Sequence, residues 1–258
     1  MSIITLTSDW GTSDFYLAAV KGTILSSLPE VTIVDVSHHI RSFDLESAAF
    51  TLRNCFRSFP RGTVHIVAIN TEESINHPHV VMKFEGHYFI GADNGVFSMI
   101  FGDAQPEEVV EINVLQDSGY FTFSTRDRFA KVAVLLLKNT PLAELGVPRQ
   151  SITRKFLFEP VVSGNVIRGQ VTHIDAYENA ITNISSQLFK REQRNRKFEI
   201  YFAGYRITKI DKGYQDVGVA DLVAIFGTHG MLEIAINQGK AASLCGLERT
   251  TQVTVTFN

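Results

Sequence analysis

The strongest constraint on the fold is an alternation of strand-like and helix-like segments along the first half of the chain. Short runs rich in Val, Ile and Leu occur at Ile3 to Thr7, Val31 to Val36 and Val64 to Ile69. Apolar residues at helical spacing lie between them, from about Asp14 to Leu28 and from Phe43 to Phe56. Nearly continuous apolar strands separated by helices are typical of a parallel sheet covered on both faces. Residues 1–150 are therefore predicted to form an α/β domain with a mainly parallel sheet.

Further patterns extend this domain. Ser13 is predicted to cap the first helix and Pro29 to end it. Val80 to Phe84 and His87 to Ile90, joined by a Glu-Gly pair, predict a hairpin added to the sheet. The mostly apolar pattern from Arg128 to Lys138 predicts a buried helix.

The pattern changes after Pro148. Ser151 to Glu159 has no clear period and is interpreted as a linker. Short strand-like runs punctuated by glycines follow it: Val166 to Ile174, Ala180 to Ile184, Phe198 to Ile210, Leu222 to Phe226, Met231 to Ile236 and Val253 to Phe257. Such spacing is typical of a small barrel or sandwich. Residues 160–258 are predicted to form an all-β, barrel-like C-terminal domain.

The net charge and the number of cysteines limit the possible binding partners and the cellular compartment of the protein. Lys and Arg total 24 and Asp and Glu total 27, which gives a net charge of −3. This balance supplies no overall field for nucleic acid or an anionic membrane, and the charged run from Lys190 to Lys197 is interpreted as a solvated surface turn. Cys55 and Cys245 exclude a disulfide scaffold. With no secretion signal in the first residues and no apolar run long enough to span a bilayer, a cytoplasmic protein is expected.

Polar residues follow the predicted parallel strands at their carboxyl ends. They are Ser8 to Gly11, Ser37 to His39 and Asn70 to Glu73. Ligands of open α/β sheets bind at this edge. A carboxylate such as Asp9 suits a vicinal diol because it can accept two hydroxyl hydrogen bonds, although Asp9 can equally cap the turn that follows it.

An ordered series of sequence blocks resembles one protein family. The blocks are Thr7 to Gly11, Asp14, Tyr16, Lys21-Gly22, Val34 to His38, Phe43-Asp44, Gly62 to His65, Asp93 to Gly95, Thr122-Phe123, Arg126-Asp127, Phe129, Ile174 to Asn179, Thr182 to Ile184, Gly230 to Ala235 and Ala241-Ala242. They are similar to the S-adenosylmethionine hydroxide adenosyltransferases, a family that includes fluorinases and chlorinases acting on S-adenosylmethionine. The similarity extends over nearly the whole chain.

The resemblance implies an α/β N-terminal domain, a β-barrel-like C-terminal domain and a homotrimer. The ligand is expected between the N-terminal domain of one subunit and the C-terminal domain of its neighbour. It implies an adenosyl compound as the small-molecule partner and no cofactor, since S-adenosylmethionine is the substrate or ligand itself.

The resemblance also implies a set of ligand-binding residues. Asp9 is expected to hold the ribose hydroxyls, Asp175 the methionine ammonium and Asn179 the adenine edge. The remaining lining residues are expected to be Phe43, Thr122, Phe123 and Thr125. From the residues alone, Asn179 can instead hold a turn, Phe43 can belong to the core, and both threonines can be ordinary strand residues.

The chain departs from the hydrolase branch of the family at the reacting residues. That branch uses an Asp after the third strand, an Arg a few residues later and a His after the Thr-Phe pair. Here these positions match Asn70, the vicinity of His77, and Ser124. A neutral amide such as Asn70 can orient a water molecule but cannot accept its proton.

Two interpretations of this departure remain open. In the first, substitutes in the same loop carry the chemistry, and the candidate catalytic residues are Asn70, Glu72, His77, Ser124 and Thr125, with Glu73 and His79 nearby. In the second, the protein binds an adenosyl compound with little or no turnover. A weaker third reading is a halide-using enzyme, because Thr125 matches a small hydroxyl position near the halide in fluorinases.

Three further expectations concern a metal site, His38 and Glu178. His77, His79 and His87 do not have the spacing of a closed zinc site, so no metal is predicted. His38 matches a position that the family often fills with histidine, and a structural hydrogen bond is expected there. Glu178 replaces a glycine of the family pattern, and would strain the turn beside Asn179 if that glycine needs a positive φ.

The leading hypothesis is a hydrolase that converts S-adenosylmethionine to adenosine and methionine.

Overall fold

The computed structural model describes residues 2–116 and 118–258, which divide into two compact units, Met1–Phe156 and Leu157–Asn258. The strands of the N-terminal unit are β1 (Ile3–Ser8), β2 (Thr32–Ser37), β3 (Val64–Ala68), β4 (His79–Phe84), β5 (His87–Ala92), β6 (Glu108–Ile112) and β7 (Gly146–Pro148). Its helices are α1 (Tyr16–Ser27), α2 (Leu45–Arg53), α3 (Val96–Phe101) and α4 (Ala130–Leu137), with short helical turns η1 (Phe56–Ser58), η2 (Thr125–Phe129) and η3 (Leu142–Glu144).

The N-terminal strands described form a seven-stranded sheet in the order β2-β1-β3-β5-β4-β6-β7. β1 pairs in parallel with β2 and β3, and β3 pairs in parallel with β5. β4, β6 and β7 extend the sheet through antiparallel pairs, so the predicted hairpin is part of it. The prediction of an α/β domain with a mainly parallel sheet is confirmed.

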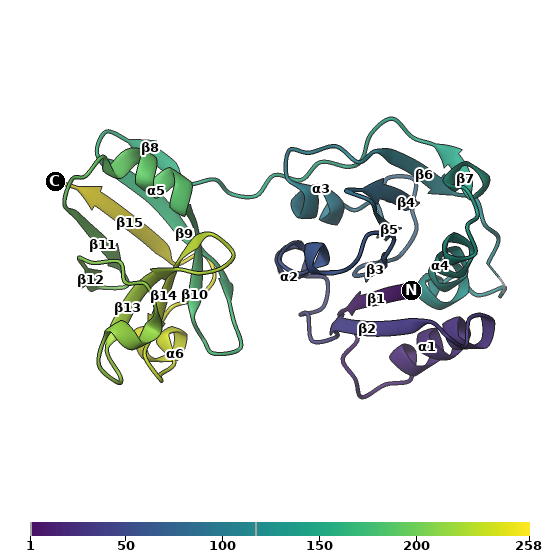
Figure 1. Cartoon of the computed structure of the whole chain (residues 1–258), viewed down its shortest axis with the longest axis horizontal. Helices are drawn as coiled ribbons and strands as arrows, with labels where there is room; N and C mark the ends of the chain where they lie inside the picture. The colour runs from purple at the N-terminus through teal and green to yellow at the C-terminus, as the bar shows by residue number, and fades with distance from the viewer. Residues whose placement is uncertain (1, 117) are drawn as a thin grey trace. The chain divides into compact units, whose positions relative to one another are not determined.

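Helices cover both faces of this sheet (Figure 1). Val20 and Ile24 of α1 and Val132 of α4 pack in a core on one face, whereas Leu52 of α2 and Phe97 of α3 pack in a second core on the other. Because β1 lies between β2 and β3, the chain runs to one side after β1 and to the other after β2. Such a reversal opens a crevice at the carboxyl ends of the central strands, where ligands bind.

Two predicted helices begin later than their sequence patterns indicated. α1 starts at Tyr16, and its N-cap is Phe15, which provides no side-chain cap, so the expected capping by Ser13 is wrong. α4 starts at Ala130, because residues Thr125–Phe129 form the π-helical turn η2 in place of regular α-helix. A π-turn within a helix often marks a functional site.

The C-terminal unit consists of antiparallel strands. They are β8 (Val161–Ser163), β9 (Val166–Ile174), β10 (Ala180–Ser185), β11 (Phe198–Phe202), β12 (Tyr205–Ile207), β13 (Leu222–Phe226), β14 (Met231–Ile236) and β15 (Gln252–Phe257). The helices are α5 (Ser186–Gln193) and α6 (Ala241–Cys245), with one helical turn, η4 (Tyr214–Asp216). The predicted strand from Phe198 to Ile210 is two strands, separated by a turn at Ala203 and Gly204, which both have positive φ.

These strands form an eight-stranded sheet with the path β12-β11-β15-β9-β10-β14-β13, to which β8 adds beside β9. Asp211, just beyond β12, bridges Ile225 of β13, so the two ends of the path approach each other. The barrel is nearly closed around Ile167, Ile234 and Val255. The predicted all-β, barrel-like C-terminal domain is confirmed.

The charged run after β10 is partly helical. α5 continues to Gln193, and only Arg194 and Asn195, which both have positive φ, form the turn. The prediction of a surface turn over the whole run is therefore wrong in its first half. Among the residues described, no helix is long and apolar enough to cross a membrane.

Candidate functional site

The carboxyl edge of the N-terminal sheet collects the predicted polar segments. Asp9 follows β1, His38 follows β2 and Asn70 lies two residues beyond β3. The parallel pairing of β1 with both β2 and β3 places these exits at one edge. This edge is the N-terminal part of the candidate site.

Asp9 and Phe43 lie directly beside each other at this edge. The backbone N–H of Phe43 donates a hydrogen bond of 2.9 Å to Oδ2 of Asp9. Phe43 has φ 65, and its side chain is 71% exposed. A non-glycine residue in the left-handed region costs free energy that the surrounding structure has to offset. The alternative that Phe43 belongs to the core is therefore wrong.

Phe123 joins the same edge through a cluster of aromatic rings. Its ring packs edge-on against Trp10, which follows Asp9, at 5.8 Å between centroids, and against Tyr16 at 5.2 Å. The Arg126 guanidinium lies 5.2 Å from the centroid of the Phe123 ring. This packing links the segment from Thr122 to Thr125 to the turn that carries Asp9.

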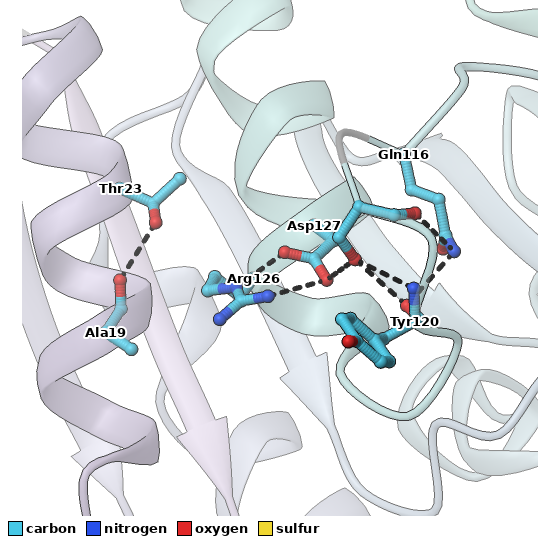
Figure 2. Close-up of polar contacts among 7 residues, drawn as sticks. Ala19, Thr23, Gln116, Tyr120, Arg126 and Asp127 are labelled. Carbon is cyan, nitrogen blue, oxygen red and sulfur yellow. Dashed lines mark hydrogen bonds and ion pairs between the residues drawn. The ribbon is translucent and has the colours of Figure 1, made fainter.

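Asp127 ties the loop before Phe123 to η2. Arg126 and the hydroxyl of Ser118 both donate to its carboxylate, the latter at 2.7 Å. Gln116 donates to the carbonyl of Tyr120 at 3.2 Å on the same loop (Figure 2). The hydrogen bond from Arg126 is the leading reason that the pKa of Asp127 is lowered. The loop is thus anchored at the helix end.

The hydroxyl-bearing candidates differ in accessibility. Thr122 is exposed in the loop, while Ser124 and Thr125 are buried at the start of η2. The alternative that the two threonines are strand residues is therefore wrong. The Oγ1 atom of Thr125 is buried and has no hydrogen-bond partner among the residues described. A buried hydroxyl without a protein partner commonly bonds an ordered water or a bound group.

The loop after β3 carries the candidates for water activation. Asn70 has φ 48 and is exposed, and its carbonyl accepts a hydrogen bond of 3.1 Å from the amide of Asn94, at the exit of β5. Glu72 is exposed and His77 is half-buried. The structure therefore places Asn70 at the edge, with Glu72 and His77 on the loop that follows it.

Arg128 is the residue at this loop that the sequence did not reveal. Its Nη1 atom lies 2.7 Å from Oε1 of Glu73 and 2.9 Å from Nδ1 of the fully buried His79. His79 uses Nε2 to donate to the carbonyl of Thr71, which leaves Nδ1 as the acceptor for Arg128. Burial lowers the pKa of His79, so the imidazole is neutral at pH 7. Because Arg128 is 55 residues from Glu73, no local pattern predicts the contact.

The three histidines considered for a metal have separate environments. Both ring nitrogens of His79 are engaged as described above, and Nδ1 of His87 lies 3.2 Å from Nε2 of His65. Within the described part of the chain, no group of three or more His, Cys, Asp or Glu residues is arranged to hold a metal ion.

Asp175 and Asn179 lie together in one turn of the C-terminal unit. Asp175 accepts hydrogen bonds from the backbone N–H of Tyr177 at 2.9 Å and of Asn179 at 2.8 Å. The side-chain amide of Asn179 donates to Oδ2 of the same carboxylate at 3.0 Å. The structure thus pairs the two predicted residues, and Asn179 does hold a turn.

Glu178 has φ 63, which confirms that this position needs the conformation expected of a glycine. Its carboxylate accepts hydrogen bonds from the backbone and hydroxyl of Ser243, and it pairs with Lys240 at 2.8 Å. The hydrogen bond from Lys240 is the leading reason that the pKa of Glu178 is lowered. These contacts attach the strained turn to the start of α6 and offset its cost.

A cavity of about 920 Å³ opens beside this turn. Asn179, Tyr177 and Tyr214 are among its lining residues. The hydroxyl of Tyr214 donates at 2.6 Å to Oε1 of the buried Glu233, and His229 lies 3.1 Å from Oε2 of the same carboxylate. From the sequence, Glu233 is included only within a segment that resembles the family, and Tyr214 is not predicted. An aromatic residue in a polar loop could have indicated a ligand contact at Tyr214.

Both parts of the chain match domains of one family. The profile of the SAM hydroxide adenosyltransferase N-terminal domain matches residues 4–146, and that of the C-terminal domain matches residues 169–254. A Methanocaldococcus jannaschii protein named (R)-S-adenosyl-L-methionine hydrolase is 30% identical over 189 residues, covering 71% of this chain and 67% of that protein.

Other relatives cover nearly the full length. A Thermus thermophilus protein of the same name is 26% identical, covering 93% of this chain and 94% of its own. A protein named fluorinase from an Actinoplanes species is 27% identical over 98% of this chain and 97% of its own. The crystal structure of an uncharacterized conserved protein from Thermotoga maritima superposes with a TM-score of 0.89 at 27% identity, over 98% of this chain and 99% of that one.

Proposed function

The chain belongs to the SAM hydroxide adenosyltransferase family, and on that premise we propose that it hydrolyses S-adenosylmethionine to adenosine and methionine. Full-length similarity to a protein named as a hydrolase of this substrate supports the proposal. The observation that carries it is the Asp9 carboxylate at the carboxyl edge of the sheet, beside the exposed ring of Phe43. A carboxylate next to an exposed aromatic ring suits a ribose diol with a nucleoside face above it.

The reaction is a displacement at the ribose 5′ carbon. An oxygen derived from water forms a bond to this carbon while the carbon–sulfur bond breaks, and its electron pair stays on sulfur as the thioether of methionine. The proton released from water passes to solvent or to a base. Because the sulfonium is already a good leaving group, the protein has to position the substrate and the water.

The described residues support this division of work. Asp9 and Phe43 hold the nucleoside, Asp175 supplies a carboxylate for the methionine ammonium, and Asn179 supplies an amide for the adenine edge. Asn179 donates one of its two side-chain N–H groups to Asp175, so its second N–H and its carbonyl oxygen remain to meet an adenine edge. Thr125 and Asn70 are proposed to orient the water, which requires no cofactor.

The direct test is incubation of the purified protein with each sulfonium epimer of S-adenosylmethionine, followed by chromatography for adenosine. Adenosine formed above the uncatalysed background, and unaffected by a metal chelator, supports the proposal. Absence of product with both epimers contradicts it. Replacement of Asn70 by Asp then asks whether a missing base limits the rate, because Asp can take up the proton that Asn cannot.

A second candidate function is binding of adenosyl compounds without turnover. It is favoured by the neutral amide of Asn70, which cannot accept the proton of a water molecule. Calorimetry separates the two functions, since tight binding of S-adenosylmethionine without adenosine formation supports the second.

The buried hydroxyl of Thr125, which has no hydrogen-bond partner among the described residues, is the reason to test a reaction with halide. A 5′-halo-adenosine product that depends on added halide identifies that branch.

We also propose that copies of the chain assemble as a homotrimer, with the N-terminal unit of one copy and the C-terminal unit of another enclosing the ligand. Large apolar side chains at the surface support self-association. The most exposed aromatic residues are Phe43, Tyr120, Phe121, Phe156, Phe158 and Tyr177. Light scattering coupled to size-exclusion chromatography tests the trimer, and a monomer at micromolar concentration contradicts it.

We further propose a cytoplasmic location, which the free thiols of Cys55 and Cys245 support.

A further inference from the structure

A chain of polar side chains runs from the surface of α1 to the residue immediately before Asp9. Lys21 of α1 donates to Oδ2 of Asp35 on β2 at 2.6 Å. Oδ1 of Asp35 lies 3.1 Å from Nε2 of His38, and Nδ1 of His38 lies 2.6 Å from the hydroxyl oxygen of Ser8. These contacts thus link α1 and β2 to the exit of β1.

The interior half of this chain is closed to solvent. His38 is 4% exposed and Ser8 is 1% exposed. The Asp35 contact has the distance of an ion pair but lacks the alignment of a good hydrogen bond. The short bond to Ser8 is therefore the stronger constraint on the imidazole, while Asp35 faces its other nitrogen.

His38 holds the Asp9 turn at two places. Its side chain bonds Ser8, one residue before Asp9, and its carbonyl accepts a hydrogen bond of 2.7 Å from the backbone N–H of Gly11, two residues after Asp9. The pairing of β1 and β2 shifts register between Leu6 and Thr7, just before these contacts. A register shift of this kind redirects the side chains that follow it.

We propose that His38 is a positioning residue that holds the Asp9 carboxylate in the orientation that recognises ribose hydroxyls, acting through Ser8 and Gly11 without touching the ligand. The inference rests on the proposed function, in which Asp9 binds ribose. Since the backbone is clamped on both sides of Asp9 and the Phe43 N–H bonds Oδ2, the carboxylate has few orientations available. Fewer alternative orientations mean a smaller entropic cost on binding.

Ser8, His38 and Asp35 are the residue types of a nucleophilic triad. The burial of the Ser8 side chain argues against a nucleophilic role. The hydroxyl oxygen of a nucleophilic serine must reach an electrophilic carbon of the substrate. Ser8 is enclosed by the sheet edge, so its hydroxyl serves as a structural link. Labelling of Ser8 by a fluorophosphonate probe would overturn the positioning role.

The test compares the dissociation constants of adenosine, 2′-deoxyadenosine and 3′-deoxyadenosine by calorimetry. The wild-type protein is expected to favour adenosine over the weaker deoxynucleoside by about tenfold or more, as for a hydrogen bond to a charged group. In the His38→Leu variant this preference should fall at least about threefold, because the Ser8 contact that holds the turn just before Asp9 is lost. His38→Asn should restore much of it, since the Asn side chain carries both a donor and an acceptor for the Ser8 hydroxyl.

Two further variants separate positioning from folding. Ser8→Ala removes the same contact with a small change in volume, and should lower the preference as His38→Leu does. His39→Leu is the matched control, because His39 is the adjacent histidine and is exposed. It should leave the preference unchanged.

The outcomes for the proposed function and for this inference are distinct. If the wild-type protein binds none of the nucleosides, the proposed function fails and the inference fails with it. If the wild-type protein binds adenosine selectively, but folded His38→Leu and Ser8→Ala weaken all three nucleosides equally, only the positioning role of His38 is overturned. A loss of preference confined to these two variants supports it.

Discussion

The backbone N–H of Phe43 donates to the carboxylate of Asp9 at 2.9 Å, which joins the segment after β2 to the exit of β1. This bond holds Phe43 at φ 65, a conformation that a large side chain rarely adopts. The strain and the exposed ring occur together at the residue that lies beside the candidate ribose site. Such a combination is expected where a backbone is held for binding and not for packing.

The strain at Phe43 predicts an unusual order of stabilities. Phe43→Gly should be more stable to urea than Phe43→Ala by about 1 kcal/mol, since only the alanine retains a Cβ in the left-handed region. Both variants should bind adenosine more weakly than the wild type, because the ring is gone. Equal stability of the two variants would show that the positive φ is not maintained in solution.

The negative charge of Asp9 is expected to contribute much of the binding free energy for adenosine. Asp9→Asn keeps an oxygen for the Phe43 N–H but loses the negative charge, so adenosine affinity should fall about tenfold or more. Asp14→Asn, at an exposed position of the following segment, is the matched control and should have no effect. Calorimetry with both variants provides the comparison. An unchanged affinity in Asp9→Asn would exclude Asp9 from the ribose site.

Tyr214→Phe should reduce stability with little effect on the cavity. The variant removes a hydrogen bond to the buried Glu233 carboxylate and should cost about 1–3 kcal/mol of unfolding free energy. Because the ring remains, adenosine affinity should change less than the stability does. Tyr177→Phe is the control, as Tyr177 is 78% exposed. A Tyr214→Phe variant as stable as the wild type would mean that Glu233 has replaced the lost partner.

A buried histidine makes stability depend on pH. Burial, reinforced by nearby His87, lowers the pKa of His65 from 6.5 to about 3. The unfolded chain therefore binds a proton at a higher pH than the folded chain does. The stability that neutral His65 contributes is fully present above pH 6.5 and is lost as the pH falls toward 3.

Urea titrations at several pH values test this dependence. His65→Gln should reduce the slope of unfolding free energy against pH in that range by at most about 1.4 kcal/mol per pH unit. His39→Gln, which changes an exposed histidine, should leave the slope as it is. The same slope in wild type and His65→Gln would assign the acid sensitivity to other groups.

Arg128 is expected to order the loop after β3. Arg128→Gln removes the guanidinium that contacts both Glu73 and His79. Amide hydrogen exchange from residue 71 to 77 should become faster, while exchange in β1 and β9 remains unchanged. Arg154→Gln, which replaces an exposed arginine, is the control. Equal exchange in the wild type and Arg128→Gln would show that the loop is ordered by its own turn.

Local patterns in the sequence predicted the elements that depend on local spacing. Val64 to Ile69 and Leu222 to Phe226 were assigned within a residue, because an apolar run of strand length is visible in the sequence itself. The start of α4 was misplaced, since a π-turn keeps helical composition and changes only the hydrogen-bond register. Asp9 is expected both from its place after the first strand and from the family resemblance, whereas the roles of Phe43, Asp175 and Asn179 come from the resemblance alone. In the structure Asp9 pairs with Phe43 and Asp175 pairs with Asn179.

The sequence by itself determined the two fold classes, the edge at which polar residues collect and the family. Only the tertiary structure decided that Arg128 reaches the loop after β3, that His38 bonds Ser8, and that Glu178 is anchored to Ser243. These partners are 55, 30 and 65 residues apart in the chain. Periodicity records how a residue is oriented within its own element, whereas such contacts depend on strand register and loop geometry, which form only when the chain packs.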